Sequence, residues 1–206
     1  MKYVEFRQKM NSFPIFSVQE IEKYFPQFDS RRLVEWQERR YLQRLRNRYY
    51  YFTDREIDEQ FLFYSANRIY HPSYISLGSA LSYYGFIPEG VFHVLSCSTL
   101  KNQKFVTNCG TFSYFHLKNA LFFGYRLLHW KKYYIAIATP EKALIDYLYL
   151  HPDIKQVEDL VALRWNILAI RDTIDRGKLI EYEKYINSPT LSQRLALLKG
   201  LLDAKS

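Results

Sequence analysis

The hydrophobic pattern of this chain changes its period near residue 40, and that change limits the folds open to its first fifty residues. Before it, two short segments space their apolar residues as helices do, and the first of them opens with a capping box formed by Ser17 and Glu20. After it, apolar and polar residues alternate from Tyr41 to Phe52, as they do in β-strands. Asn47 divides that run at a position suited to a turn, because Asn tolerates positive φ. Two short helices followed by a hairpin predict a winged helix-turn-helix.

Capping residues and prolines mark the helix ends in this region. We expect one helix over residues 4–10, a second over 17–26, and a third that starts at Asp29 or Ser30 and runs to about Arg40. The apolar residues that the second and third helices are expected to bury are Val18, Ile21, Tyr24, Phe25, Leu33, Val34 and Trp36.

The positive charge of the chain is concentrated in the same segment. The net charge is +8 over 206 residues. Residues 1–55 hold twelve basic and seven acidic side chains, a surplus of five, whereas the other 151 hold seventeen and fourteen, a surplus of three. Between Arg39 and Arg48 there are five arginines and no acid. Most of them therefore lack the carboxylate at i, i+4 that usually pairs with arginine on a merely solvated helix surface.

Arginine at these positions indicates a nucleic-acid ligand, because a guanidinium bonds a guanine edge or a phosphate equally well. Side chains near the start of the third helix would meet base edges, and we assign that role to Arg31, Arg32 and Glu35. Contacts to phosphates or the minor groove are assigned to Arg39, Arg40, Arg44, Arg46 and Arg48. We therefore predict binding to duplex DNA; a merely solvated basic face and binding to RNA are the alternatives.

The rest of the chain predicts an α+β fold class, with a winged helix-turn-helix domain over 1–58 and a second domain over 59–206. A charged helix over 53–65 is expected to connect them. The second domain is expected to hold a small mixed or antiparallel sheet with strands over 91–96, 104–108, 111–116 and 133–138. Helices are expected over 74–84 and 139–150 and, in a helical C-terminus, over 157–168, 179–186 and 190–202. We expect Thr190 and Gln193 to form a capping box for the last helix.

Polar residues of the second domain have structural roles in our interpretation. Lys142 and Asp146 are expected as a surface pair of opposite charge on the helix that Thr139 caps, although Glu141 and Asp146 are also candidates for binding a partner. His116 is expected to be structural, because no acid or nucleophile accompanies it. Serines recur every third position, which favours a close helix crossing over a ligand-facing stripe, and they are Ser73, Ser76, Ser79 and Ser82.

Three segments of the second domain together resemble one family, the AbiEi-type antitoxins. They are 74–89 (YISLGSALSYYGFIPE), 110–116 (GTFSYFH) and 139–146 (TPEKALID), and the likeness runs in the same order over nearly the whole chain. The resemblance implies a winged-helix repressor domain followed by an antitoxin domain, encoded beside a nucleotidyltransferase-like toxin. It also implies repression of their shared operon at inverted repeats. The chain departs from the family at the turn of the wing, where Asn47-Arg48 stands in place of the glycine that relatives often carry.

Inverted repeats imply two protomers at each DNA site, and they leave open both how the protomers pair and whether the protein touches the toxin. Two alternatives to the antitoxin also stay open. One is a stand-alone winged-helix regulator without a toxin partner. The other is an RNA-binding or protein-docking module that uses the many tyrosines.

Other classes of protein find no support in the sequence. It has no GxGxxG, GxxxxGK[ST], HExxH or GxSxG motif, so we predict neither an enzyme nor a cofactor. Cys97 and Cys109 lack the spacing of a zinc site or a disulfide framework. The chain has no run of eighteen apolar residues and it begins with charged residues, which predicts a cytoplasmic protein that does not bind membranes.

Overall fold

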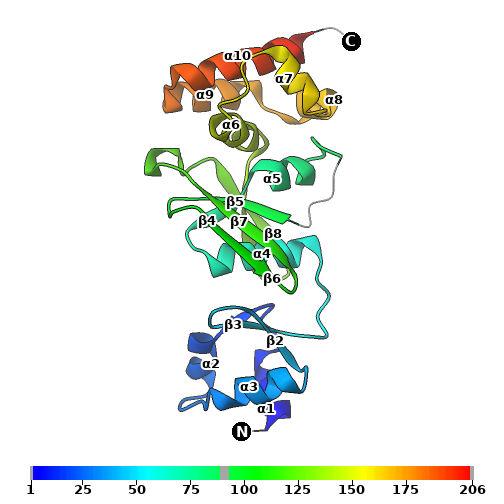
Figure 1. Ribbon diagram of the computed structural model, residues 1–206, viewed down its shortest axis with the longest axis vertical. Coiled ribbons are helices and arrows are strands. Elements are labelled where there is room, and N and C mark those ends of the chain that lie inside the picture. The colour runs from blue at the N-terminus through cyan, green and yellow to red at the C-terminus, as the bar shows by residue number, and fades with distance from the viewer. Residues whose placement is uncertain (1, 89–92, 205–206) are drawn as a thin grey trace.

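A computed structural model describes residues 2–88 and 93–204 of the chain, and the fold is mixed α+β, as predicted. Figure 1 shows three tiers along the long axis of the molecule. The N-terminal helices and a small sheet lie at one end, a larger sheet lies in the middle, and the C-terminal helices lie at the other end. Within the described residues, no helix is both long enough and apolar enough to cross a membrane.

The N-terminal unit, residues 2–52, combines short helices with an antiparallel sheet of order β1-β3-β2. Its elements are α1 Tyr3–Met10, β1 Phe16–Ser17, α2 Val18–Tyr24, α3 Arg31–Glu38, β2 Leu42–Arg46 and β3 Tyr49–Phe52. The predicted capping box is confirmed, because Ser17 Oγ accepts the Glu20 N–H at 3.2 Å and Glu20 Oε2 accepts the Ser17 N–H at 2.8 Å. The third helix ends two residues earlier than predicted, since Arg40 takes a φ of 56° that a helix cannot contain.

A small aromatic core holds the N-terminal unit together. The ring of Phe6 lies at its centre, 4.5 Å from the ring of Trp36 between centroids. Its buried members are Phe6, Met10, Phe16, Ile21, Leu33, Trp36, Leu42, Tyr50 and Phe52. The expectation that Val34 and Tyr24 are buried is wrong: they are 56% and 43% exposed, because α3 and α2 are short and each turns only one narrow side inward.

The larger sheet has the strand order β6-β7-β5-β4-β9-β8 and is mixed, since β4 runs parallel to β9 and β5 runs parallel to β7. Helix α4 covers one face of the sheet, and helices α5 and α6, the latter Pro140–Leu150, lie on the other (Figure 1). The elements of this tier are α4 Glu59–Ile69, β4 Ser73–Ile75, α5 Leu77–Tyr83, β5 His93–Ser98, β6 Gln103–Thr107, β7 Gly110–His116, the 3-10 helix η1 Asn119–Leu121, β8 Tyr125–Trp130 and β9 Tyr133–Ala138.

The predicted start positions of two helices in this region are wrong. Residues 53–58 are not helical, and α4 begins only after Asp58, whose Oδ1 accepts the Phe61 N–H at 2.6 Å. The helix expected over 74–84 starts instead at Leu77, because the residues before it form β4, with Tyr74 paired to Cys97 in the ladder. The spacing of apolar residues there fits a helix, but long-range strand pairing overrides it.

The strands of the larger sheet are only partly as predicted. Strands β5, β6, β7 and β9 lie close to the expected ranges, although the expected start of β5 at 91–92 lies outside the described residues. Strands β4 and β8 are additional. Strand β8 is an edge strand, and its Tyr125 and Leu127 are 42% and 62% exposed, so it lacks the buried alternating side that marks a strand in a sequence.

The third tier is helical, as predicted. Its helices are α6 Pro140–Leu150, α7 Val157–Ala162, α8 Ile167–Thr173, α9 Arg176–Ile186 and α10 Pro189–Asp203. The cap at Thr139 is confirmed, with its Oγ1 accepting the Lys142 N–H at 3.3 Å. The single helix expected over 157–168 is wrong, because Arg164, at a φ of 52°, interrupts it. The capping box at Thr190 is also wrong: α10 starts one residue earlier, and Ser188 is its N-cap.

A second and larger core joins α4, the larger sheet and the C-terminal helices. Three side chains of the N-terminal unit, Ile15, Leu45 and Tyr51, belong to this core and not to the small one. The predicted domain boundary between residues 58 and 59 falls at the start of α4. Buried apolar side chains from both sides of this boundary nevertheless pack in one core.

Candidate nucleic-acid interface

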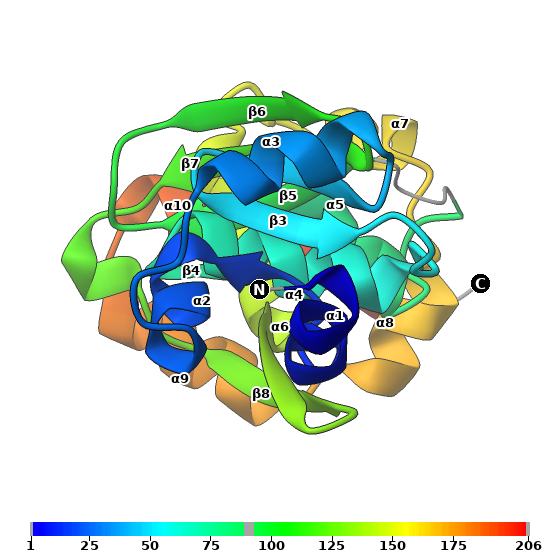
Figure 2. The same cartoon turned by 90° about the horizontal axis from the view of Figure 1, so that it is seen from below.

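Helix α3 lies at the free end of the N-terminal unit, turned away from the larger sheet (Figures 1 and 2). Leu33 and Trp36 pack inward, which leaves Arg31, Arg32 and part of Glu35 at the surface. Asp29 fixes the start of the helix, because its Oδ1 accepts the Arg31 N–H at 3.0 Å. Ser30 takes the N-cap position but makes no side-chain cap bond. Two arginines are therefore exposed at the first turn of a helix that stands free for a partner.

Acidic neighbours hold the arginines of α3 in place. Arg31 Nη2 lies 2.9 Å from Asp29 Oδ2, and this contact lowers the pKa of the Asp29 carboxyl. Glu35 bridges two guanidinium groups, with its Oε2 3.0 Å from Arg32 Nη1 and its Oε1 3.1 Å from Arg39 Nη2. Such exposed pairs contribute little to stability, so a phosphate or a base edge can replace the carboxylate at small cost. Glu35 thus positions the side chains of Arg32 and Arg39 through ion pairs.

The other exposed arginines of the site lie between α3 and the β2–β3 hairpin or on the hairpin itself. Arg40, Arg44 and Arg48 are exposed, and no ion pair of theirs occurs within residues 2–88 and 93–204. Arg44 Nη2 donates to Asn47 Oδ1 at 2.5 Å, so the turn holds one of its own arginines. The positive φ expected at Asn47 belongs instead to Arg48, at 67°. Arg48 thus takes the left-handed position of the turn, and its side chain is exposed.

Arg46 is the one predicted site residue that the structure moves away from the candidate interface. Its Nη1 donates to the Ile69 carbonyl at 2.7 Å, and its guanidinium carbon lies 3.4 Å from the centroid of the Phe105 ring. Burial lowers the pKa of this guanidinium. The pairing shifts register between Arg44 and Arg46 while Leu45 turns into the larger core, so simple alternation predicted the wrong side for Arg46. Arg46 joins the two units.

Further polar contacts fix the N-terminal unit against the larger sheet. Arg68 of α4 donates to Glu20 Oε1 at 2.6 Å, and Glu20 is the residue whose other oxygen closes the capping box of α2. On the opposite side, the Tyr133 hydroxyl donates to the Ser12 carbonyl at 2.6 Å. The start of α2 and the segment that follows α1 are thus each held by a residue from beyond the connection.

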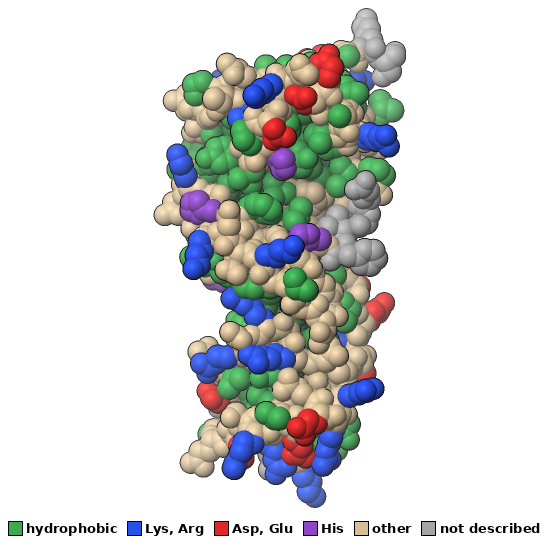
Figure 3. Space-filling view, in the orientation of Figure 1, with side chains coloured by type: hydrophobic (Ala, Val, Ile, Leu, Met, Phe, Trp, Pro, Cys, Tyr) green, Lys and Arg blue, Asp and Glu red, His purple; other side chains and the backbone are tan. Residues whose placement is uncertain are grey.

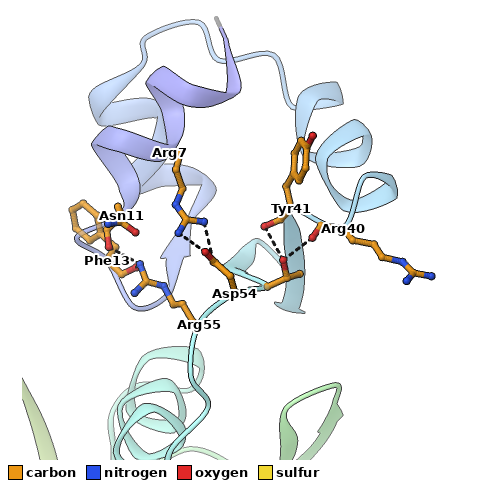
Figure 4. Close-up of polar contacts among 8 residues, drawn as sticks. Arg7, Asn11, Phe13, Arg40, Tyr41, Asp54 and Arg55 are labelled. Atoms are coloured by element: carbon orange, nitrogen blue, oxygen red, sulfur yellow. Dashed lines mark hydrogen bonds and ion pairs between the residues drawn. The ribbon is translucent and has the colours of Figure 1, made fainter.

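The connection itself is tied down, as Figure 4 shows. Arg7 of α1 makes a two-pronged bond to Asp54, at 2.9 and 2.7 Å. Arg55 Nη2 donates to the carbonyls of Asn11 and Phe13, at 2.5 and 2.8 Å. Asp54 and Arg55, two of the charged residues that predicted a connecting helix, instead bind a non-helical segment to the N-terminal unit.

The surface view agrees with this placement. Figure 3 shows Lys and Arg side chains gathered at the lower end of the molecule, with some acidic side chains between them, where the N-terminal unit lies. The exposed arginines of this unit lie on α3, just after it and on the hairpin. We call this set the basic end, and its members are Arg31, Arg32, Arg39, Arg40, Arg44 and Arg48.

A second polar cluster is completely enclosed, and it overturns the expected surface pair. Lys142 and Asp146 are buried, at 0% and 1% exposure, and are in direct contact through Lys142 Nζ and Asp146 Oδ1. Asp146 Oδ2 accepts the hydroxyls of Tyr74 and Ser76, both at 2.8 Å, and Lys142 Nζ donates to the Tyr74 oxygen at 2.8 Å. Burial, helped by the Asp146 charge, raises the pKa of the Tyr74 hydroxyl. Spacing alone could not reveal this cluster, because a surface pair has the same i, i+4 separation.

The other motif residues have structural contacts. Glu141 is also buried, and its Oε1 accepts the Asp175 N–H at 2.7 Å at the start of α9. Ser79 Oγ accepts the Leu95 N–H at 2.8 Å, which ties α5 to β5. His116 is exposed, and its ring Nδ1 lies 3.1 Å from the Leu100 carbonyl. The alternative that Glu141 and Asp146 bind a partner is wrong for these enclosed carboxylates.

Comparison with the models of known protein families gives no match for this chain, and comparison with curated proteins gives none either. Across the described part of the chain, no group of three or more His, Cys, Asp or Glu side chains is arranged to hold a metal ion.

Proposed function

We propose that the N-terminal unit is a winged helix-turn-helix that binds duplex DNA. Helix α3 would enter the major groove, and the β2–β3 hairpin would be the wing, lying along the phosphate backbone. The observation that carries the proposal is the basic end. There the free helix α3 presents Arg31 and Arg32 at its first turn, and the adjacent hairpin presents Arg44 and Arg48 at its tip. The helix supplies contacts to bases, and the hairpin supplies contacts to phosphates.

We further propose that the chain is an autorepressor and antitoxin, acting in the cytoplasm on its own operon and not as an enzyme. The resemblance of three segments to AbiEi-type antitoxins supports this. Two of those segments meet in the enclosed cluster, since Tyr74 and Ser76 come from the first while Lys142 and Asp146 come from the last. The functional partners in this proposal are operator inverted repeats, bound by two protomers, and a nucleotidyltransferase-like toxin.

The central test is a titration of the protein with duplex DNA from its own upstream region. If several phosphates are contacted, a threefold increase in salt should lower the affinity by about a power of ten or more, because each neutralised phosphate releases counterions. Mobility shifts or fluorescence anisotropy at two salt concentrations measure this. A single-stranded RNA competitor should displace the duplex poorly. No binding, binding that ignores salt, or preference for the RNA would refute the proposal.

Base and phosphate contacts predict different mutational effects. Arg48→Ala should weaken binding to all duplexes alike and reduce the slope of log affinity against log salt by about 1. Arg32→Ala should in addition relax the preference at one operator position, by about 1–3 kcal/mol. Affinities for the operator and for a scrambled duplex measure both effects. Equal losses on both duplexes for both variants would contradict the assigned roles. The control variant is Lys178→Gln on α9, which should leave both affinities unchanged.

A further inference from the structure

An open groove lies where the wing meets the larger sheet. It has a volume of about 470 Å³, and β2 with its turn forms one wall while β6 and the β6–β7 turn form the other. Strands β2 and β6 are in contact, so the groove runs between the edge strands of two separate sheets. One wall therefore belongs to the proposed DNA-binding unit and the other to the second domain.

The lining of this groove suits an anion. Its charged residues are Arg44, Arg46 and Lys104, and no carboxylate lines it. Neutral donors, the amides of Asn47 and Asn108, stand beside them. Arg46 already bonds the Ile69 carbonyl, so Arg44 and Lys104 are the two cations left to face a ligand.

The groove also has a fixed shape. The Phe105 ring packs against the guanidinium of Arg46, and Leu45 is buried in the larger core. Lys104 itself is exposed on β6, and Arg44 is held toward the turn by Asn47. Two cations thus lie on opposite walls, above packed side chains of both units, and a chain of phosphates can lie between them.

We propose that this groove binds backbone phosphates of the DNA, with Arg44 as the contact from the wing and Lys104 as a further contact, supplied by the second domain, beyond the stretch that α3 and the wing reach. The proposal rests on the proposed DNA-binding function. It extends that function by making the footprint on DNA longer than the N-terminal unit alone can cover.

The test compares two duplexes, one just covering the site of α3 and the wing, and one extended by about a helical turn on each side. Lys104→Gln should weaken binding to the long duplex about three- to tenfold, reduce its salt slope by about 1, and leave binding to the short duplex unchanged. Lys178→Gln, a change of another exposed lysine on α9, should alter neither. Both sites are exposed, so the variants should fold, which thermal unfolding verifies.

The outcomes distinguish a failure of the phosphate contact at Lys104 from a failure of the proposed DNA-binding function. If the wild-type protein binds and Arg48→Ala weakens it while Lys104→Gln changes nothing on the long duplex, the groove has no phosphate contact and DNA binding stands. Equal losses for Lys104→Gln on both duplexes would overturn the longer footprint. If the wild-type protein binds no duplex, both inferences fail.

Discussion

Replacing Asp146 with Ala should lower the free energy of unfolding by about 3–5 kcal/mol, because it leaves the ammonium of Lys142 buried without its charge partner. The hydroxyls of Tyr74 and Ser76 would also lose the acceptor that they share. Urea unfolding followed by circular dichroism measures the loss as a lower midpoint at an unchanged slope.

The matched control is Asp203→Ala, which removes a carboxylate from an exposed ion pair. The side chain of Asp203 is 60% exposed, and that of its partner Arg176 is 52% exposed. It should cost at most about 1 kcal/mol. The double change Lys142→Met with Asp146→Leu should recover most of the stability lost in Asp146→Ala, since no lone charge remains. Equal losses for Asp146→Ala and Asp203→Ala would show that burial does not govern this pair.

Replacing Trp36 with Ala should unfold the N-terminal unit while the second domain stays folded. Trp36 is 2% exposed and packs against Phe6 in a small core, which has nine buried side chains among the described residues. Truncating such a side chain costs about 3–5 kcal/mol. Hydrogen exchange should show lost protection over α1 to β3 and retained protection in the larger sheet. DNA binding should be lost with it.

Trp165→Ala is the reciprocal control. Trp165 is 7% exposed, lies in the larger core, and packs edge-on against Tyr147 at 5.1 Å. Its truncation should lower protection among the C-terminal helices and change the affinity for DNA by less than about twofold. If Trp36→Ala instead melts both units in one transition, the two cores form one cooperative unit, and the division near residue 58 is wrong.

The sequence predicts best where local chemistry decides the structure. The capping box at Ser17 and the Thr139 cap followed by proline each act within one turn of chain, and the two helices begin where those signals lie. The change of period near residue 40 likewise marks the start of β2, since alternation is a property of one strand and its burial.

Prediction fails where the deciding partner is far along the chain. Arg46 was assigned to DNA because the alternation around it is regular, but its partners Ile69 and Phe105 lie in other elements. Lys142 and Asp146 read as a surface pair for the same reason: their burial depends on Tyr74, which comes from a strand 68 residues before Lys142. Strand β8 was missed because an exposed edge carries little apolar alternation.

The arginine contacts across the junction also bear on how the protein would measure distance on DNA. Arg46 fastens the hairpin to the Ile69 carbonyl, Arg68 fastens α4 to Glu20 in α2, and Arg55 fastens the connection, so α3 is not joined to the second domain by a free tether. In two protomers bound to an inverted repeat, each helix would keep a constant orientation to its own second domain. If the two second domains also contact each other, the number of base pairs between the half-sites is constrained too, because one added base pair rotates a half-site by about a tenth of a helical turn.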